Sequence, residues 1–576
     1  VPLKKRWETF RNILCSKSIK CITFNSVVGL MPLHFHRAED LNQQMDLVLT
    51  SIWDIKLAAW ILRPDAKEVD LEFASFVAGF PHLCQSKTLV PENASPNLVQ
   101  LINIKDRLSY LLAMYPIISR SITKKGLADS LDQIEGPLQS VLSAMECIGV
   151  GFLPHTYQNI EQRLDNRIEE LSLEARNIAG NNSFLCSSPQ QVAQLLYDVL
   201  KLPVPKDTMP RTATTSSQHR STSEAILEAI KSSTPHRIID ILLEFRSLNK
   251  LLTSYIKPLP FLARKPYLRE ASLSSKPIVR IHPMWMQTAV RTGRLSCRKP
   301  NMQQIPKDST FDVAPRDAFC ATAHDMCLFS FDYSQNEVRI LAHMSEDQQL
   351  ISLFLNKDGL DIYKQMSSLV TGKTVDSVTI EERAITKQVV LAILYGMGIS
   401  QVSKKLGINR SKAQHFFNSF FARFKQTRRW IDMTKESAKK LGFVTTIVGR
   451  RRYLDEIRSN DSAKRAQAER QAVNSVIQGS AADLMKLAML KIGSRITDWH
   501  KEGHSAGGTG RHPRMLLQIH DELLFEIANN KDDIQRLKDA IICCCAEECE
   551  LDLKLKVPLK VNCSVGSSWG DGMKDC

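Results

Sequence analysis

The chain has 576 residues, which at roughly 150 residues per domain predicts about four domains or subdomains and more than one core. Hydrophobic residues make up 43% and charged residues 24% of the chain, ordinary globular usage that excludes a disordered or fibrous protein. Lysine and arginine outnumber aspartate and glutamate by 76 to 61, so the charge favours a polyanionic partner such as nucleic acid, although a merely soluble basic protein would carry the same charge.

The cysteines and the first residues bear on compartment and membrane. The 14 cysteines are scattered, and no CxxC pair occurs, which argues against a disulfide framework and against a structural zinc site. We therefore expect thiols in a reducing compartment. No run reaches the roughly 18 apolar residues of a membrane span. The opening residues, VPLKKRWETF, lack the apolar core of a signal peptide and begin abruptly, so we expect that a longer chain precedes them.

The first half of the chain mixes β-rich and helical segments. Residues 1–135 contain the β-rich run Cys21–Val28 and the helical run Ile55–Leu62. Beyond them the helical period dominates, and it predicts a long charged helix over His155–Ala179. The basic segment Pro203–Ser223 is rich in Pro, Ser and Thr and has no apolar period, so it predicts a loop. That loop is either an arm that contacts phosphates or an ordinary surface insertion.

The second half alternates strands and helices. Residues 286–345 contain strand-like runs that end at CLFSFDYS, and residues 346–485 return to helices with a hairpin predicted at Gly442–Leu454. A second loop is predicted over Lys501–Arg514, followed by the apolar strand MLLQIHDELLFEI. Strands that flank a helical insertion and then return predict one sheet built from distant segments, an α+β arrangement.

Two carboxylates at the ends of apolar strands are the first candidates for chemistry. Asp332 follows the strand Cys327–Phe331, and Asp521 ends the strand Met515–His520. A buried carboxylate is costly unless it is paired or holds a cation. If the two strands pair, both aspartates come to one edge and can share divalent cations that activate a hydroxyl and stabilise a leaving pyrophosphate. The residues alone leave open that both are ordinary strand-end turn residues.

The helix predicted between these strands carries a stripe suited to a nucleotide. Its members recur every four residues and share one face: Arg383, Lys387, Leu391 and Tyr395. Arg and Lys suit phosphates, and the apolar and aromatic positions suit a base, unless the helix is simply amphipathic with solvated cations. A second stripe with the same spacing offers donors for base edges or sugars, or is simply surface. It comprises Arg470, Asn474 and Gln478.

Several blocks resemble the motifs of the A-family DNA polymerases. Motifs A, B and C are matched by FDYSQNEVRILAHMS (Phe331–Ser345), RAITKQVVLAILYG (Arg383–Gly396) and QIHDELLFE (Gln518–Glu526). Two further blocks match QTAVRTGRLSCRKPNMQQIP (Gln287–Pro306) and ERQAVNSVIQGSAADLMKLAM (Glu469–Met489). The match is collinear from about residue 136 to residue 570. Within the family the chain is most similar to the eukaryotic nu and theta group, and STSEAIL and GSSWG resemble nu more than theta.

The resemblance implies an α+β right-hand polymerase, with a palm sheet and helical fingers and thumb, preceded by a degenerate exonuclease-like α/β domain. The implied domains are 1–135 (exonuclease-like), 136–285 (thumb), 286–345 (first part of the palm), 346–485 (fingers) and 486–576 (second part of the palm). Primer–template DNA and deoxynucleoside triphosphates are the implied partners. A monomer in the nucleus, working beside other repair proteins and without a membrane, is the expected setting.

The resemblance also assigns catalytic roles. Asp332 and Asp521, with the backbone carbonyl of Tyr333, are expected to hold two Mg²⁺ ions, which Mn²⁺ can replace. One ion would lower the pKa of the primer 3′-hydroxyl and the other would neutralise the triphosphate. Glu522 is expected to support the site or the primer end. Lys387 is expected to bind phosphate and is a candidate acid for the pyrophosphate.

Further positions are assigned to the nucleotide and to DNA. Arg383 is expected to bind phosphates, and Gln335 and Glu337 to line the nucleotide pocket. Glu337 with Tyr395 matches the family's steric gate, in which a carboxylate fills the space of a 2′-hydroxyl. Contacts with the primer–template near its terminal pair, largely from the minor groove, are implied for Arg294, Gln303, Arg470, Asn474, Gln478 and His520.

Three departures from the family pattern matter. Leu391 stands where Phe or Tyr is usual, so stacking on the incoming base is lost and altered base and sugar discrimination is expected. Tyr363 aligns with a usual His near the phosphates and can still donate one hydrogen bond. In residues 1–135, Asn25 stands where an Asp belongs after the KCITF strand, and the Asp-x-Glu and Tyr-xxx-Asp elements are absent. Without carboxylates no cations assemble, so no proofreading is predicted.

The basic turn GRRRYL (Gly449–Leu454), which includes Arg451, is expected to contact the template backbone unless it is a solvated hairpin. The sequence favours a template-directed DNA polymerase without proofreading, used in DNA repair or translesion synthesis. A catalytically silent DNA-binding scaffold is the alternative from another class, and the intact Asp332 and Asp521 argue against it. A single-subunit RNA polymerase is a further alternative, which Glu337 at the gate position disfavours.

Overall fold

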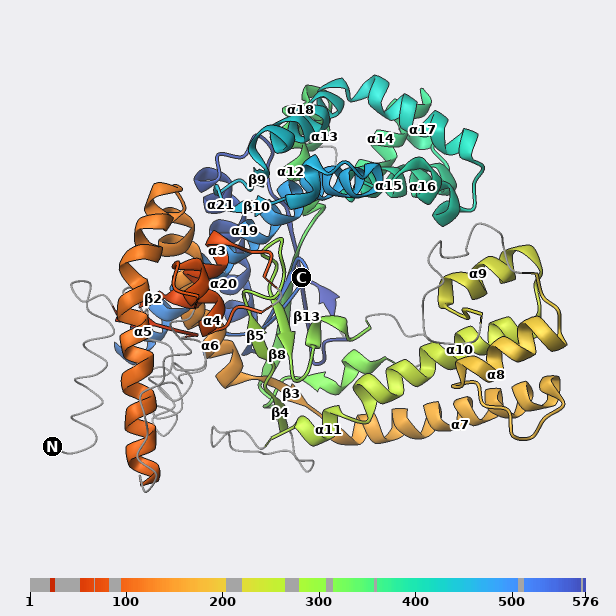
Figure 1. Ribbon diagram of the computed structural model, residues 1–576, viewed down its shortest axis with the longest axis horizontal. Coiled ribbons are helices and arrows are strands. Elements are labelled where there is room, and N and C mark those ends of the chain that lie inside the picture. The colour runs from red at the N-terminus through yellow and green to blue at the C-terminus, as the bar shows by residue number, and fades with distance from the viewer. Residues whose placement is uncertain are drawn as a thin grey trace.

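The computed structural model describes residues 21–25, 52–66, 68–81, 95–203, 220–264, 279–306, 314–356, 360–505, 512–570 and 573–576. A central antiparallel sheet lies between an N-terminal part on one side and a long helical arm on the other (Figure 1). A further group of helices arches above the arm. The molecule therefore has the α+β organisation that the sequence predicts.

The N-terminal part packs two short parallel strands against helices. It contains β1 (Cys21–Thr23), β2 (Ile52–Asp54), α3 (Ile55–Leu62), α4 (Leu71–Val77), α5 (Pro96–Lys124) and the π-helical turn η2 (Ser130–Glu135). Helix α3 has the bounds that the sequence predicts. It begins there because the Asp54 carboxylate accepts hydrogen bonds from the amides of Lys56 (2.8 Å) and Leu57 (3.4 Å). A separate hydrophobic core, from Trp53 to Leu131, holds this part together.

The helical arm starts from α6 and is built on two long helices that pack along each other. Its elements are α6 (Gly136–Ile148), α7 (Pro154–Ala179), α8 (Pro189–Gln194), η3 (Leu195–Val199), α9 (Glu224–Ser233), α10 (Arg237–Leu251), η5 (Leu252–Ile256) and α11 (Leu259–Leu262). Helix α7 confirms the predicted charged helix and ends at Gly180, whose φ of 61° suits glycine. Most of the predicted loop Pro203–Ser223 lies outside the described residues.

The central sheet brings strands together from both halves of the chain. Its order is β11 (Arg514–Ile519), β12 (Glu522–Ala528), β8 (Met326–Tyr333), β13 (Val561–Gly566) and β14 (Lys574–Asp575), antiparallel throughout. The prediction of one strand over MLLQIHDELLFEI is wrong, because the chain reverses at His520 and Asp521 into a hairpin. His520 has a φ of 54°, and no glycine, proline or asparagine marks this turn in the sequence.

Smaller elements cover the sheet. They are the three-stranded sheet of β4 (Val279–Ile281), β3 (Val150–Phe152) and β7 (Phe319–Cys320), the hairpin of β5 (Met284–Met286) and β6 (Ser296–Arg298), the 3₁₀ turns η6 (Met302–Gln304) and η7 (Pro315–Ala318), and α20 (Lys531–Ile541), η10 (Ile542–Glu547) and α21 (Glu548–Asp552). One continuous hydrophobic core joins the sheet to the arm.

The arched group of helices forms its own core. It contains α12 (Asn336–Ser345), α13 (Gln348–Leu355), α14 (Ile362–Thr371), η8 (Val375–Ser377), α15 (Ile380–Leu394), α16 (Ile399–Leu406), α17 (Arg410–Arg423), α18 (Lys425–Leu441), the hairpin of β9 (Phe443–Thr445) and β10 (Arg451–Tyr453), and η9 (Asp455–Arg458). The hairpin confirms the prediction for Gly442–Leu454. The predicted first part of the palm, 286–345, includes α12, and the apolar side chains of this helix that pack in the second core are Val338, Ile340, Leu341 and Ala342.

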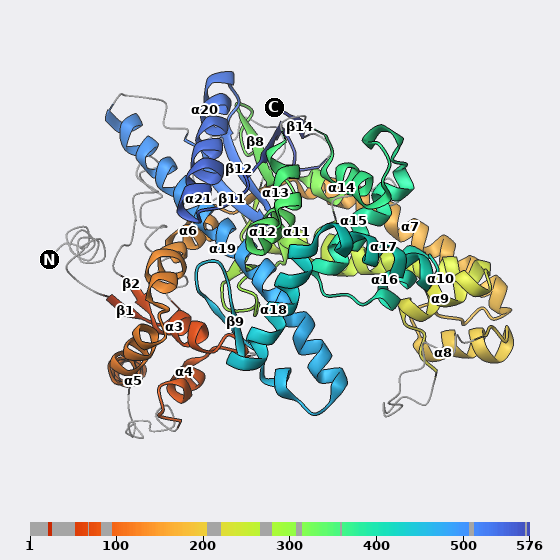
Figure 2. The same cartoon turned by 90° about the horizontal axis from the view of Figure 1, so that it is seen from above.

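Helix α19 (Ser462–Ser505) is 44 residues long and joins the two cores. It contacts α18 near one end and α20 towards the other, as the view from above shows (Figure 2). The loop predicted from Lys501 is wrong for its first residues, because the helix continues to Ser505. Among the described residues, no helix combines the length and apolar character needed to cross a bilayer.

Candidate active site

The sheet places Asp332 and Asp521 at one edge, although their strands are not direct neighbours. Strand β12 lies between β11 and β8, and its first residue, Glu522, is opposite Asp332 in the antiparallel register. The backbone amide of Tyr333 donates a hydrogen bond to the backbone carbonyl of Asp521 at 3.1 Å. The predicted convergence of the two aspartates is therefore confirmed, with the hairpin turn rather than direct pairing as its cause.

The two aspartates differ in environment. Asp332 is exposed on a strand whose other residues are buried, and Asp521 is half-buried. Burial raises the pKa of Asp521, against the opposing effects of Arg294 and of the Asn336 amide. Partial burial of a carboxylate beside a second one is the setting that a bound cation stabilises.

The donors at this edge suit a hard divalent cation. Two carboxylates and the backbone carbonyl of Tyr333 are oxygen ligands of the kind that Mg²⁺ prefers. Tyr333 itself is anchored from below, since its buried hydroxyl donates to the carbonyl of Cys545 at 2.5 Å. Across the described ranges, no group of three or more His, Cys, Asp or Glu side chains is arranged to hold a metal ion.

Glu522 is held by partners of its own. Its carboxylate accepts a hydrogen bond from the indole Nε1 of Trp569 at 3.3 Å and lies 3.8 Å from the Arg316 guanidinium. Arg316 in turn stacks over the Trp569 ring at 4.0 Å. Neither of these two partners was predicted from the sequence. They fit the prediction that Glu522 supports the site rather than serving as an obligatory ligand.

Glu337 and Tyr395 meet beside Asp521. The Tyr395 hydroxyl hydrogen-bonds the Glu337 carboxylate, and Arg294 forms an ion pair with the same carboxylate. Burial raises the pKa of Glu337; Arg294 opposes this shift, and Asp521 adds to it. Burial, followed by the charge of Glu337, also raises the pKa of Tyr395. The structure therefore joins α12 to the end of α15 through the residue pair that the sequence predicted as a gate.

Arg383 and Lys387 of α15, which we call the phosphate stripe, face the start of α14. Arg383 makes a two-pronged pair with Asp361, with Nε to Oδ1 at 3.0 Å and Nη2 to Oδ2 at 2.7 Å. The Tyr363 ring lies 5.9 Å from the Arg383 guanidinium and 5.8 Å from the Lys387 ammonium. Burial, then the Asp361 charge, raises the pKa of Tyr363 to about 12. Arg383, Lys387 and Tyr363 thus lie together, and Asp361 is a member that the sequence did not reveal.

Two further pocket residues have defined positions. Leu391 is half-buried against the core of the helical group. Gln335 precedes α12 with a φ of 51°, and its side-chain oxygen accepts a hydrogen bond from the Ser334 hydroxyl at 2.7 Å. Contact of either residue with a nucleotide stays a prediction.

A cavity of about 210 Å³ adjoins Asp521 on the side of the β5–β6 hairpin. Its lining includes three of the predicted DNA contacts, Arg294, Gln303 and His520, together with Asp521. Gln303 is fixed there because its amide donates to the carbonyl of Leu295 at 3.2 Å and to the side-chain oxygen of Gln518 at 3.1 Å. Burial and the charge of Arg294 lower the pKa of His520, which favours its neutral ring.

The second stripe lies on α19 beside the end of α15. The Asn474 amide donates to the Leu394 carbonyl at 3.5 Å. Gly396 has a φ of 63°, and a Cβ there would lie 2.8 Å from the Cβ of Arg470, so the close packing of these helices requires glycine. Gln478 is half-buried further along α19. Contacts of Arg470, Asn474 and Gln478 with DNA remain predictions.

The burial of Arg450 and Arg452 leaves them no surface for the template, whereas template contact by the GRRRYL turn through Arg451 stays a prediction. Arg450 and Arg452 are only 3% and 7% exposed, and they pair with Asp483 and Asp65 inside the molecule. Arg451 is half-buried, donates to the Lys125 carbonyl at 2.8 Å and stacks on Phe443. The sequence shows three cations in a row, but the alternation of a strand turns the outer two inward.

Two polar side chains follow the parallel strands of the N-terminal part. Asn25, after β1, accepts a hydrogen bond from the Lys56 ammonium at 3.1 Å. Asp54, at the end of β2, is fully buried, caps α3 and accepts from the Gln139 amide at 2.9 Å. The Asp54 carboxylate is thus engaged in holding the start of α3 and the Gln139 amide. Resemblance of residues 1–135 to an exonuclease domain stays a prediction.

The comparisons with known proteins agree with this arrangement. The family described as DNA polymerase family A matches residues 154–571. The chain belongs to DNA polymerase family A. It is 36% identical over 437 residues to the thermostable DNA polymerase I of Thermus thermophilus, covering 76% of this chain and 48% of that protein. It is 30% identical over 525 residues to DNA polymerase I of Geobacillus stearothermophilus, covering 90% and 55%.

A solved structure of the family extends the likeness to nearly the whole chain. The POL domain of Pol1 from M. smegmatis, in complex with DNA primer-template and dNTP, superposes with a TM-score of 0.79 at 26% identity, covering 99% of this chain and 90% of that one. The chain spans about half the length of the curated family A relatives it matches. The predicted family and fold class are therefore confirmed.

Proposed function

We propose that this protein is a template-directed DNA polymerase that adds deoxynucleotides to a primer 3′ end. The observation that carries the proposal is the convergence of Asp332 and Asp521 at one sheet edge, with Glu337 and Tyr395 joining that edge to the phosphate stripe of α15. The family A relatives, and a solved neighbour in complex with DNA primer-template and dNTP, support the same substrates here.

The residues divide the work by chemistry. Asp332, Asp521 and the Tyr333 carbonyl would hold divalent cations, two Mg²⁺ by proposal, which supply charge stabilisation to the attacking hydroxyl and to the leaving pyrophosphate. Arg383 and Lys387 bind the triphosphate, the first as a fork and the second as a point charge. The Lys387 ammonium also carries a proton for the departing pyrophosphate. Glu337, held by Arg294 and Tyr395, occupies the space that a 2′-hydroxyl would need.

A finer assignment belongs to the same proposal. We infer a polymerase without proofreading, of the nu and theta group, that acts in DNA repair or translesion synthesis in the nucleus. Asn25 accepts a hydrogen bond from Lys56, and the Asp54 carboxylate caps α3 and accepts a hydrogen bond from Gln139. These structural roles support the lack of proofreading. Leu391 in place of an aromatic residue supports a site with altered discrimination.

Primer extension tests the activity directly. Purified protein, a labelled primer–template, all four deoxynucleotides and Mg²⁺ are expected to give template-length products, and Asp521→Asn and Asp332→Asn are expected to give none. Both variants should still bind the primer–template in a gel-shift assay. If the unchanged protein binds DNA but extends no primer with Mg²⁺ or Mn²⁺, the protein is the silent scaffold instead.

Proofreading is tested separately with a mismatched primer end and no deoxynucleotides. We expect no shortening of the labelled primer. Removal of nucleotides that co-purifies with the protein, and that depends on residues 1–135, would overturn this part of the proposal.

A further inference from the structure

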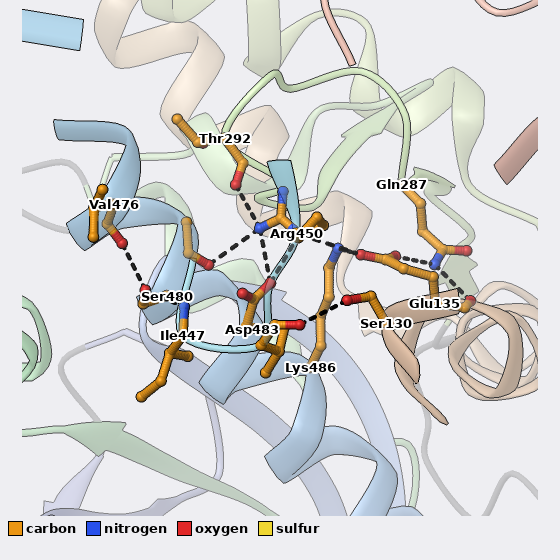
Figure 3. Close-up of polar contacts among 12 residues, drawn as sticks. Ser130, Glu135, Gln287, Thr292, Ile447, Arg450, Val476, Ser480, Asp483 and Lys486 are labelled. Atoms are coloured by element: carbon orange, nitrogen blue, oxygen red, sulfur yellow. Dashed lines mark hydrogen bonds and ion pairs between the residues drawn. The ribbon is translucent and has the colours of Figure 1, made fainter. Parts of the chain in front are cut away.

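A buried cluster of charges lies where the N-terminal part, the β9–β10 hairpin and α19 meet (Figure 3). Arg450 pairs with Asp483 through Nε at 3.0 Å and Nη2 at 2.8 Å. The Lys486 ammonium pairs with Glu135 at 2.5 Å. All four side chains are 3% exposed or less, so each charge depends on its partner. None of them belongs to the catalytic edge itself.

Arg450 also reaches out of this cluster to the loop before β6. Its Nη2 donates to the Thr292 carbonyl at 2.8 Å and to the Gly479 carbonyl at 3.2 Å (Figure 3). Gly293 packs directly against the guanidinium, since a Cβ built there would lie 2.3 Å from Arg450 Cζ and Nη1. Gly293 also has a φ of 89°, which glycine adopts readily. The loop is therefore shaped around the Arg450 side chain.

The next residue along this loop is Arg294, which pairs with Glu337. Glu337 in turn accepts the Tyr395 hydrogen bond beside Asp521. Contacts thus link Arg450 to Thr292 and Gly293. The next residue, Arg294, contacts Glu337, which together with Tyr395 forms the proposed gate for the sugar. Small displacements of residues in a pre-organised site lower its activity and selectivity. A shift of Thr292 and Gly293 should therefore alter the sugar selection made by Glu337 and Tyr395.

We propose that Arg450 is a positioning residue for sugar selection, which acts through the Thr292–Gly293 loop on the Arg294–Glu337 pair. This inference rests on the proposed polymerase function and deepens it, since it names a determinant of deoxyribose preference outside the pocket. The fork of Arg450 is essential to the role, because one guanidinium holds Asp483 and the Thr292 carbonyl together.

Three variants test the path. Arg450→Met removes the guanidinium, Arg450→Lys keeps the charge without the fork, and Gly293→Ala inserts a methyl group against Arg450 without changing any charge. The measurement is the kcat/KM for a deoxynucleotide divided by that for the matching ribonucleotide. We expect Arg450→Met and Gly293→Ala to lower this ratio about 10- to 100-fold, and Arg450→Lys to lower it less.

Arg452→Met is the matched control. It removes another buried arginine of the same hairpin, one that pairs with Asp65; because Asp65 lies 4.0 Å from Arg291, this arginine is linked to the loop only indirectly. We expect the control to lose thermal stability and to keep the sugar ratio within about twofold of the unchanged protein. Adding Glu337→Ala to Arg450→Met should change the ratio little beyond Glu337→Ala alone, because both act on one group.

The inference fails if Arg450→Met and Gly293→Ala keep the ratio of the unchanged protein, or if Arg452→Met lowers it equally. A nucleotide-binding assay distinguishes a failure of this inference from a failure of the proposed polymerase function. Titration of dATP and ATP into a complex with a dideoxy-terminated primer gives the sugar ratio without turnover. A protein that extends no primer refutes the proposed function, while the shift of this binding ratio in Gly293→Ala still supports or overturns the role of Arg450.

Discussion

Glu522 on β12 lies directly across the sheet from Asp332 on β8, yet its carboxylate is held by Trp569 and lies near Arg316. Three carboxylates thus stand side by side at one edge with different surroundings. Asp332 is exposed, Asp521 is half-buried, and Glu522 is tied to an indole that comes from the end of the chain. We propose that these different surroundings, more than the type of acid, assign cation binding to the two aspartates and a supporting role to Glu522.

The first prediction separates Asp521 from the adjacent Glu522. Asp521→Asn should lower kcat at least about 10²- to 10³-fold, because it removes a negative ligand from a site built to hold cations. Glu522→Gln should lower it less than about tenfold, since the amide oxygen still accepts from Trp569. Single-turnover extension in Mg²⁺ measures both. Equal losses in the two variants would contradict the division of roles.

The second prediction concerns sugar choice at Glu337. Glu337→Ala should raise ribonucleotide incorporation about 10- to 200-fold, because the carboxylate no longer fills the space of a 2′-hydroxyl. Competition between a deoxynucleotide and its ribonucleotide on one template measures the change. Tyr395→Phe, which removes only the hydroxyl that bonds Glu337, is a milder companion variant. Unchanged sugar selection in Glu337→Ala would remove this residue from the gate.

The third prediction concerns Leu391. Its half-buried side chain lies on α15 between Lys387 and Tyr395, where an aromatic ring would stack on a base. Leu391→Tyr should improve use of dideoxynucleotides and change the error rate by roughly tenfold, equivalent to about 1.4 kcal/mol of stacking. Extension with dideoxy terminators and error counting on an undamaged template provide the two measurements. No change in either would show that Leu391 does not face the base.

The fourth prediction is a pH dependence of stability. Glu146 is 2% exposed, and burial raises its pKa from 4.5 to about 7 in spite of its bond from the Trp285 amide. The folded state therefore binds a proton that the unfolded state has released, and the free energy of unfolding falls as pH rises from 4.5 to 7. Glu146→Gln keeps the acceptor and should stabilise the protein at pH 8 by up to about 3 kcal/mol.

Urea unfolding of Glu146→Gln and the unchanged protein, at pH 5 and pH 8, measures this effect. The two free energies of unfolding should differ most at pH 8 and much less at pH 5, near the lower end of the window from 4.5 to 7. Glu170→Gln, a change at an exposed helix position, serves as a control and should show no such divergence. A constant difference at both pH values would place the origin of the effect outside the ionisation of Glu146.

Local elements of this fold were predictable because their signals are local. The bounds of α3 follow from an apolar run after a capping aspartate, and α7 follows from its period and a closing glycine. The stripe on α15 needed only four-residue spacing. The gate pair came from the family resemblance, which also favoured the meeting of the two aspartates over the alternative that both are ordinary turn residues.

The features that could not be predicted from the sequence depend on contacts between distant parts of the chain. The reversal at His520 and Asp521 carries no glycine, proline or asparagine, and the aspartate alone did not distinguish a hairpin turn from a strand end, so one strand was predicted where two occur. Glu135 and Lys486 are 351 residues apart, and nothing in the sequence around either residue predicts a buried ion pair. The inward direction of Arg450 depends on Asp483 in the same way. Asp361, opposite Arg383, was likewise hidden until α14 and α15 were seen to pack.

The sheet that carries the aspartates is closed late along the chain. Strand β8 is flanked by β12 and by β13, whose residues 561–566 lie within the last 16 positions of the sequence. During synthesis, α15 and its cations emerge well before either flanking strand. The edge that carries Asp332 and Asp521 is therefore assembled only after both flanking strands have followed α15, so we expect a chain truncated before β12 to lack it.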